Sequence, residues 1–183
     1  VRSYWALSQA LGEYYQAIRQ HAALAAVATA DRAANDAALQ AALAGEAARI
    51  RVAHAAAVQA QHVLAERLEL PPQASLPAPA DLPLTSPYRT YYETFFENQR
   101  FGSREQRRAA RIHHSLPLNH RALESLAASI AAADRYWDQT SQAFRAGKAT
   151  SDALLKAYTG VKQQRQLFLQ TVEERNRSIA EYA

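Results

Sequence analysis

The sequence contains no cysteine, which excludes disulfide bonds, thiolate metal sites and cysteine nucleophiles. Glycine is scarce, with 5 residues among 183, and all 7 prolines lie between Pro71 and Pro117. The long stretches on either side of that window therefore lack proline, the strongest helix breaker, and should be helical. The sequence contains no run of about 18 apolar residues, the length that a helix needs to cross a bilayer. No signal peptide precedes Val1, and because Val1 is not methionine we expect a processed or excised piece of a longer protein.

Alanine dominates the 49% of residues that are hydrophobic. Alanine suits closely packed helices and gives a thin core, so the sequence predicts helix-on-helix packing. The net charge of +4 and the pI near 9.5 favour acidic partners without singling out nucleic acid.

Residues 1–70 have helical periodicity in two blocks. Apolar residues recur at steps of three and four in both, first at Tyr4, Leu7, Leu11, Tyr14 and Ile18, then at Leu39, Leu43, Ile50, Ala57, Leu64 and Leu68. Turn and N-cap formers gather at 29–36 between the blocks. This pattern predicts an antiparallel hairpin with its turn near 29–36. The alternative is one unbroken helix of about 65 residues, roughly 100 Å long.

Residues 71–116 form a connector that is rich in proline and then in aromatic residues. Proline favours extended backbone, so we expect the connector to lie along the helices, anchored by Tyr88, Tyr91, Tyr92, Phe95 and Phe96. Short helices are plausible at 89–99 and 103–113. A third long helix should begin at Ser115–Leu118, because Pro117 is tolerated in a first turn.

The pattern of apolar and turn-forming residues in 117–183 predicts a second hairpin. Its first helix carries an uninterrupted seam of Leu123, Leu126, Ile130, Ala133, Trp137, Thr140 and Phe144. A tight turn should follow at 145–152, where Gly147 can end one helix and Thr150 or Ser151 can cap the next. In the last helix, Arg165 and Arg175 interrupt the apolar stripe. The predicted fold class is all-α: two elongated antiparallel hairpins forming a four-helix bundle or coiled-coil-like module, with an irregular connector.

The sequence lacks the motifs typical of catalytic, cofactor-binding and metal-binding sites. The histidines do not pair at the spacing of metal ligands, and no phosphate-binding glycine loop or nucleophile elbow is present, so we expect a protein that is not an enzyme and has no cofactor or metal. Glu46 and the pair Glu173–Glu174 are interpreted as solvated. Residues 100–114 form the one concentrated basic run, interrupted by Glu105, and the alternative function is a stand-alone helical interaction domain with a basic face that could bind nucleic acid.

In the C-terminal hairpin, a turn that contains Gly147 leads into a helix that begins around Leu154–Leu155 and ends in an N-x-x-I-A-x-Y pattern, which reads Asn176, Ile179, Ala180 and Tyr182. This hairpin resembles the last long hairpin of TolC-like outer-membrane efflux proteins, in which a glycine-containing turn leads into a leucine-rich helix with the same closing pattern. The opening Tyr4–Leu7, and Leu82–Leu84 with Pro87–Thr90, are similar to a divergent bacterial subgroup of the family.

The resemblance implies a trimeric conduit whose helical hairpins stand in the periplasm, at the outer membrane. The chain would self-associate and would meet the membrane only through segments that it does not contain. In the family, the hairpin tip docks a periplasmic adaptor protein. The matching positions are Ala146, Gly147 and Lys148, of which Gly147 keeps the family's glycine. Binding to nucleic acid is not favoured on this interpretation.

Overall fold

The computed structural model describes residues 2–28, 36–81, 83–88 and 103–182. These residues form the helices α1 (Arg2–Ala28), α2 (Ala37–Arg67), α4 (Arg104–Arg145) and α5 (Ser151–Tyr182), and no strand occurs among them. The fold is all-α, as the sequence predicts.

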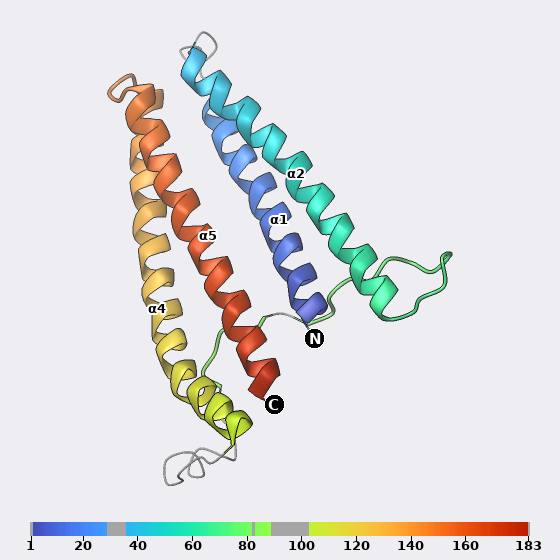
Figure 1. The fold of residues 1–183 in the computed structure, drawn as a ribbon. Coiled ribbons are helices and arrows are strands. Elements are labelled where there is room, and N and C mark those ends of the chain that lie inside the picture. Colours follow the sequence, from blue (N-terminus) through green and yellow to red (C-terminus); the bar gives the residue numbers. More distant parts are fainter. Residues whose placement is uncertain (1, 29–35, 82, 89–102, 183) are drawn as a thin grey trace.

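The helices pair as two antiparallel hairpins, α1 with α2 and α4 with α5 (Figure 1). Residues 1–70 therefore do not form one unbroken helix: α1 ends at Ala28, and the Asp36 side chain caps α2 by accepting from the Leu39 N–H at 3.0 Å. Residues 29–35 of the expected turn lie outside the described part. The start of α1 and the end of α5 lie at the end of the molecule opposite the turn between α4 and α5 and opposite the facing ends of α1 and α2. α5 is the central helix, because it packs on α4, α1 and α2.

The main core cluster lies just below the turns, where all four helices contribute to it. Its buried members are Leu24, Val27, Leu39, Phe144, Leu154 and Tyr158. Phe144 is buried as expected, whereas Trp137 is only partly buried, at the edge of this cluster. The Trp137 ring lies 5.7 Å from that of Tyr158 on α5, so the predicted seam does meet the fourth helix. The cluster joins the hairpins at their tips.

The start of the third long helix differs from the prediction. α4 begins at Arg104, not near Pro117, and runs through the proline; His113 and His114 lie within it rather than closing a short helix. Ser103 and Gln106 form a capping box that fixes the earlier start. Pro117 removes one backbone hydrogen bond, and burial of the neighbouring Ile112 and Leu116 offsets that loss. α4 bends in this region (Figure 1), as proline commonly causes.

All four helices hold the described connector. Gln61 of α2 donates to the Pro77 carbonyl at 3.1 Å, and the Tyr4 hydroxyl of α1 contacts Asp81. His120 of α4 hydrogen-bonds the Thr85 carbonyl at 3.2 Å. Of the predicted aromatic anchors, Tyr88 packs edge-on to Tyr182, with ring centroids 6.4 Å apart. Tyr91, Tyr92, Phe95 and Phe96 lie outside the described residues.

Candidate functional site

The predicted partner-binding residues Ala146, Gly147 and Lys148 form the exposed tip of the second hairpin. Gly147 has φ 74°, in the left-handed region that favours glycine. Its N–H bonds the Phe144 carbonyl at 2.9 Å, and the Lys148 N–H bonds the Ala143 carbonyl at 2.8 Å. This pair of bonds is the Schellman motif, which satisfies the last carbonyls of α4. The turn lies where the sequence predicts it.

Thr150 completes the reversal by capping α5. Its hydroxyl accepts from the Ala153 N–H at 3.2 Å, and its carbonyl accepts from the Leu154 N–H at 3.1 Å. Of the two N-cap candidates, Thr150 therefore takes that position, and Ser151 is the first helical residue. The tip is an ordered turn between two well-terminated helices.

Polar contacts join the second hairpin's tip to the end of α1 and the start of α2. Arg145, the last residue of α4, donates to the Ala26 carbonyl in the last turn of α1 at 3.1 Å. The Ser151 hydroxyl bonds the Asp36 carboxylate, and this hydrogen bond is the main cause that lowers the pKa of Asp36. With the core cluster beneath them, these contacts hold the second tip against the last turn of α1 and the start of α2.

Lys148 gives this tip an available positive charge. Its side chain is exposed and forms no ion pair within the described residues, whereas the nearby Lys156 is paired with Asp152 at 2.9 Å. That pair raises the pKa of Lys156, chiefly through its hydrogen bond to Asp152. The tip can therefore offer a cation on a rigid turn, which suits contact with another protein.

A buried ionic network links the hairpins below the tip. Glu46 of α2 is only 4% exposed and accepts from Lys162 of α5 at 2.7 Å. Arg49 lies 3.3 Å from the second carboxylate oxygen and donates to Gln20 of α1 at 2.7 Å. Burial, followed by the nearby Glu46 carboxylate, raises the pKa of Tyr158 above its ordinary value. The interpretation of Glu46 as solvated is thus wrong, because α5 covers the face of α2 that carries it.

Arg175 and Asn176 clamp the connector onto α5. Arg175 is fully buried and donates to the carbonyls of Leu84 and Ser86. The Asn176 side chain accepts from the Leu84 N–H at 2.8 Å and donates to the Leu84 carbonyl at 3.1 Å. Burial lowers the pKa of Arg175. In the sequence, Arg175 is a break in the apolar stripe of the last helix. The one signal that it could hold the connector is that a long side chain with several hydrogen-bond donors occupies a position on that stripe.

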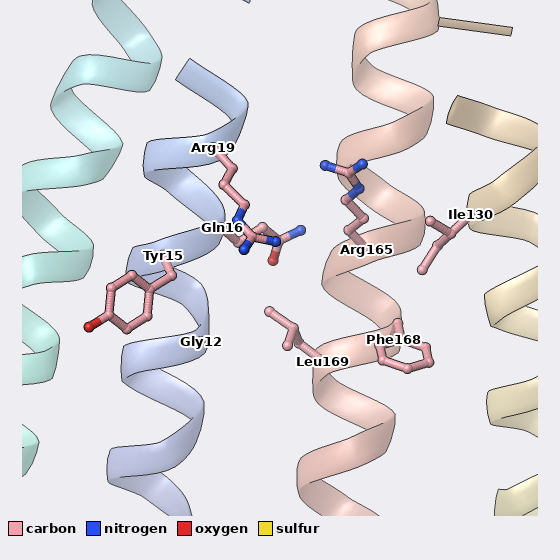
Figure 2. A pocket seen from close by; sticks show the side chains of 8 residues that line it. All are labelled: Gly12, Tyr15, Gln16, Arg19, Ile130, Arg165, Phe168 and Leu169. Atoms are coloured by element: carbon pink, nitrogen blue, oxygen red, sulfur yellow. The ribbon is translucent and has the colours of Figure 1, made fainter. Parts of the chain in front are cut away.

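A groove of about 560 Å³ lies between the hairpins, and no motif in the sequence indicates it. Figure 2 shows Gln16 of α1 and Leu169 of α5 reaching toward each other across the space between these helices. Arg165, at the groove's edge, bonds both oxygens of Asp134 on α4 at 2.8 and 3.0 Å. The groove's exposed surface is mainly apolar, and Arg165, one of the two arginines that line it, is already paired.

Within the part of the chain that the structure describes, no three or more histidine, aspartate or glutamate side chains are grouped to hold a metal ion. The same residues include no helix with the length and apolar character needed to cross a membrane. Compared with known proteins, the chain matches no family model, no curated protein and no solved structure. The function therefore has to be argued from the arrangement of the helices and the tip.

Proposed function

We propose that this chain is the helical, periplasmic part of an outer-membrane efflux or secretion conduit of the TolC-like type. It would line the conduit wall and dock a periplasmic adaptor protein through Ala146, Gly147 and Lys148. The observation that carries the proposal is the arrangement of two long hairpins packed through α5 and α1, with the α4–α5 turn and the end of α1 at one end of the molecule and the start of α1 and the end of α5 at the other (Figure 1).

The surfaces of the outer helices suit lateral association. α2 exposes an alanine-rich face, and so does α4 on the other side of the molecule; the exposed alanines are Ala37, Ala38, Ala41, Ala44, Ala48, Ala55 and Ala56 on α2, and Ala122, Ala127, Ala128, Ala131 and Ala132 on α4. Small side chains let helix backbones approach closely. If α2 of one copy packs on α4 of the next, the same contact repeated around an axis closes a ring.

The absence of native cysteine makes this association testable by disulfide cross-linking. Ala48 and Ala132 lie on the exposed faces of α2 and α4, at similar distances from the tips. Oxidation of the double variant Ala48→Cys/Ala132→Cys should give covalent trimers. Each single variant serves as a control, because it can give at most a dimer. A double variant that stays monomeric after oxidation, or single variants that dimerise as readily, would count against the wall arrangement.

Docking at the tip has its own test. In cells that produce the full-length protein, Lys148→Glu should reduce export while the circular dichroism spectrum of the purified chain stays unchanged. Lys156→Glu is the matched control, since Lys156 is also an exposed lysine near the tip but already pairs with Asp152. Equal export by both variants and the wild type would reject docking through Lys148.

The alternative, a stand-alone helical domain that binds nucleic acid, rests on the arginines at the start of α4. Binding to DNA or RNA that weakens steeply with salt would favour it over the conduit.

A further inference from the structure

A second groove, of about 650 Å³, lies between the first turns of α4 and the last turn of α5. It is at the end of the molecule that carries the chain termini, opposite the hairpin tips (Figure 1). Its polar lining consists of four arginines, two hydroxyls and one carboxylate. The arginines are Arg104, Arg107, Arg108 and Arg111, and we refer to this site as the arginine groove.

The charge in the arginine groove is unbalanced. Glu181 is the carboxylate that lines it; it pairs with Arg108 at 2.6 Å and also with Arg2 at 3.3 Å. The hydrogen bond from Arg108 is the main cause that lowers the pKa of Glu181. Glu105 does not line the groove, because it lies about 100° around the helix from Arg104 and faces a neighbouring hollow instead. Although Glu105 interrupts the basic run in the sequence, its negative charge therefore does not line the arginine groove.

Three guanidinium groups remain without a carboxylate. Arg104, Arg107 and Arg111 form no ion pair or hydrogen bond among the described residues. They recur at steps of three and four along one face of α4, where like charges repel and destabilise the helix. An anion bound between them would remove that repulsion.

The groove's donors fit a phosphoryl group. Guanidinium groups present planar pairs of N–H donors that match phosphate oxygens, and three unpaired cations favour a doubly charged anion over a single carboxylate. The Ser115 hydroxyl already donates to the Ile112 carbonyl at 2.8 Å, so the remaining donor is the Ser178 hydroxyl. Arg108 is held in place by Glu181 and adds a fixed positive charge.

We propose that the arginine groove binds a dianionic phosphoryl group, carried either by a soluble phosphate compound or by a lipid headgroup. This site is distinct from the hairpin tip, and the inference uses neither the conduit nor the adaptor. A negative result here would leave the proposed function standing, and the reverse also holds.

The first test is a calorimetric titration of the full chain with inorganic pyrophosphate at low salt. We expect saturable binding at one site per chain, weakened at least about tenfold in Arg107→Gln/Arg111→Gln. The matched control is Arg51→Gln/Arg135→Gln, which removes the same charge from exposed positions outside the groove and should change affinity less than about twofold. Absence of saturable binding, or equal weakening in both variants, would overturn the proposal.

A flotation assay separates the two sources of the phosphoryl group. If the ligand is a lipid headgroup, vesicles containing phosphatidic acid should carry the wild-type chain, vesicles of phosphatidylcholine alone should not, and the groove variant should fail to float. If the ligand is soluble, pyrophosphate binds as above while neither kind of vesicle carries the chain. Equal flotation of the wild type and both variants would show a general charge effect and would contradict a site at the arginine groove.

Discussion

In the buried ion pair that links the hairpins, Glu46 is much less exposed than Lys162. This difference predicts which of the two substitutions destabilises the protein more. The Glu46 side chain is 5% exposed, whereas those of Lys162 and Arg49 are 30% and 28% exposed. Removing the lysine leaves a buried carboxylate with Arg49 alone. Removing the glutamate leaves two cations that can turn toward water.

We therefore expect Lys162→Met to lower the free energy of unfolding by about 2–3 kcal/mol, less than the roughly 3–5 kcal/mol for breaking a fully buried pair, because Arg49 remains. Glu46→Gln should cost only about 1 kcal/mol. The double variant Glu46→Leu/Lys162→Leu should lie within about 1 kcal/mol of the wild type, since it removes both charges and their desolvation together.

Urea denaturation followed by circular dichroism measures all three variants. Lys156→Met is the control, because Lys156 and its partner Asp152 are both 75% exposed, and it should leave the transition midpoint unchanged. If Glu46→Gln proves more destabilising than Lys162→Met, the assignment of Glu46 as the desolvated partner is refuted.

Four further predictions concern the turns, the seam and the connector. Gly147→Val should cost about 1–2 kcal/mol, because valine is disfavoured at φ 74°. Conversely, Glu69→Gly should stabilise the chain by about 0.5–1 kcal/mol, because Glu69, which follows the C-cap residue Leu68 of α2, has φ 52°. Thermal unfolding measures whether each variant is less or more stable than the wild type. A Gly147→Val variant as stable as the wild type would contradict the left-handed conformation at Gly147. Trp137→Ala should cost about 2–3 kcal/mol, less than for a fully buried tryptophan, and an unchanged melting temperature would reject the seam. Asn176→Ala should speed amide exchange at Leu84, whose N–H it leaves without its acceptor, while exchange in the core of α5 stays slow; protection at Leu84 equal to that of the wild type would argue against the clamp.

The described helices could be predicted closely where a local signal is strong. The turn at Gly147 was predicted because only glycine enters the left-handed region cheaply, and the seam through Phe144 because its spacing is regular over several turns. The start of α4 is the exception: Pro117, which is tolerated in a first turn, predicts a later start, whereas the capping box at Ser103, also visible in the sequence, sets the start at Arg104.

The first helix shows the limit of periodicity. Its spacing pointed to Ile18, yet Ile18 is 38% exposed and its neighbour Ala17 is fully buried. α1 packs against both α2 and α5, so its buried face is set by two partners whose positions the local sequence does not contain. A helical pattern identifies a stripe to within about one residue, and the packing of neighbouring helices selects its centre.

The sequence by itself determined the helical class, the tight turn at Gly147 and the absence of cysteine chemistry, because these depend on residue type and on spacing along the chain. Only the tertiary structure decided that Glu46 is buried, that Arg175 and Asn176 hold the connector, and that four arginines line a single groove with Glu181. These features join residues distant in the sequence. Burial and charge pairing at such sites depend on which surfaces meet in space, and periodicity within a single helix cannot specify that.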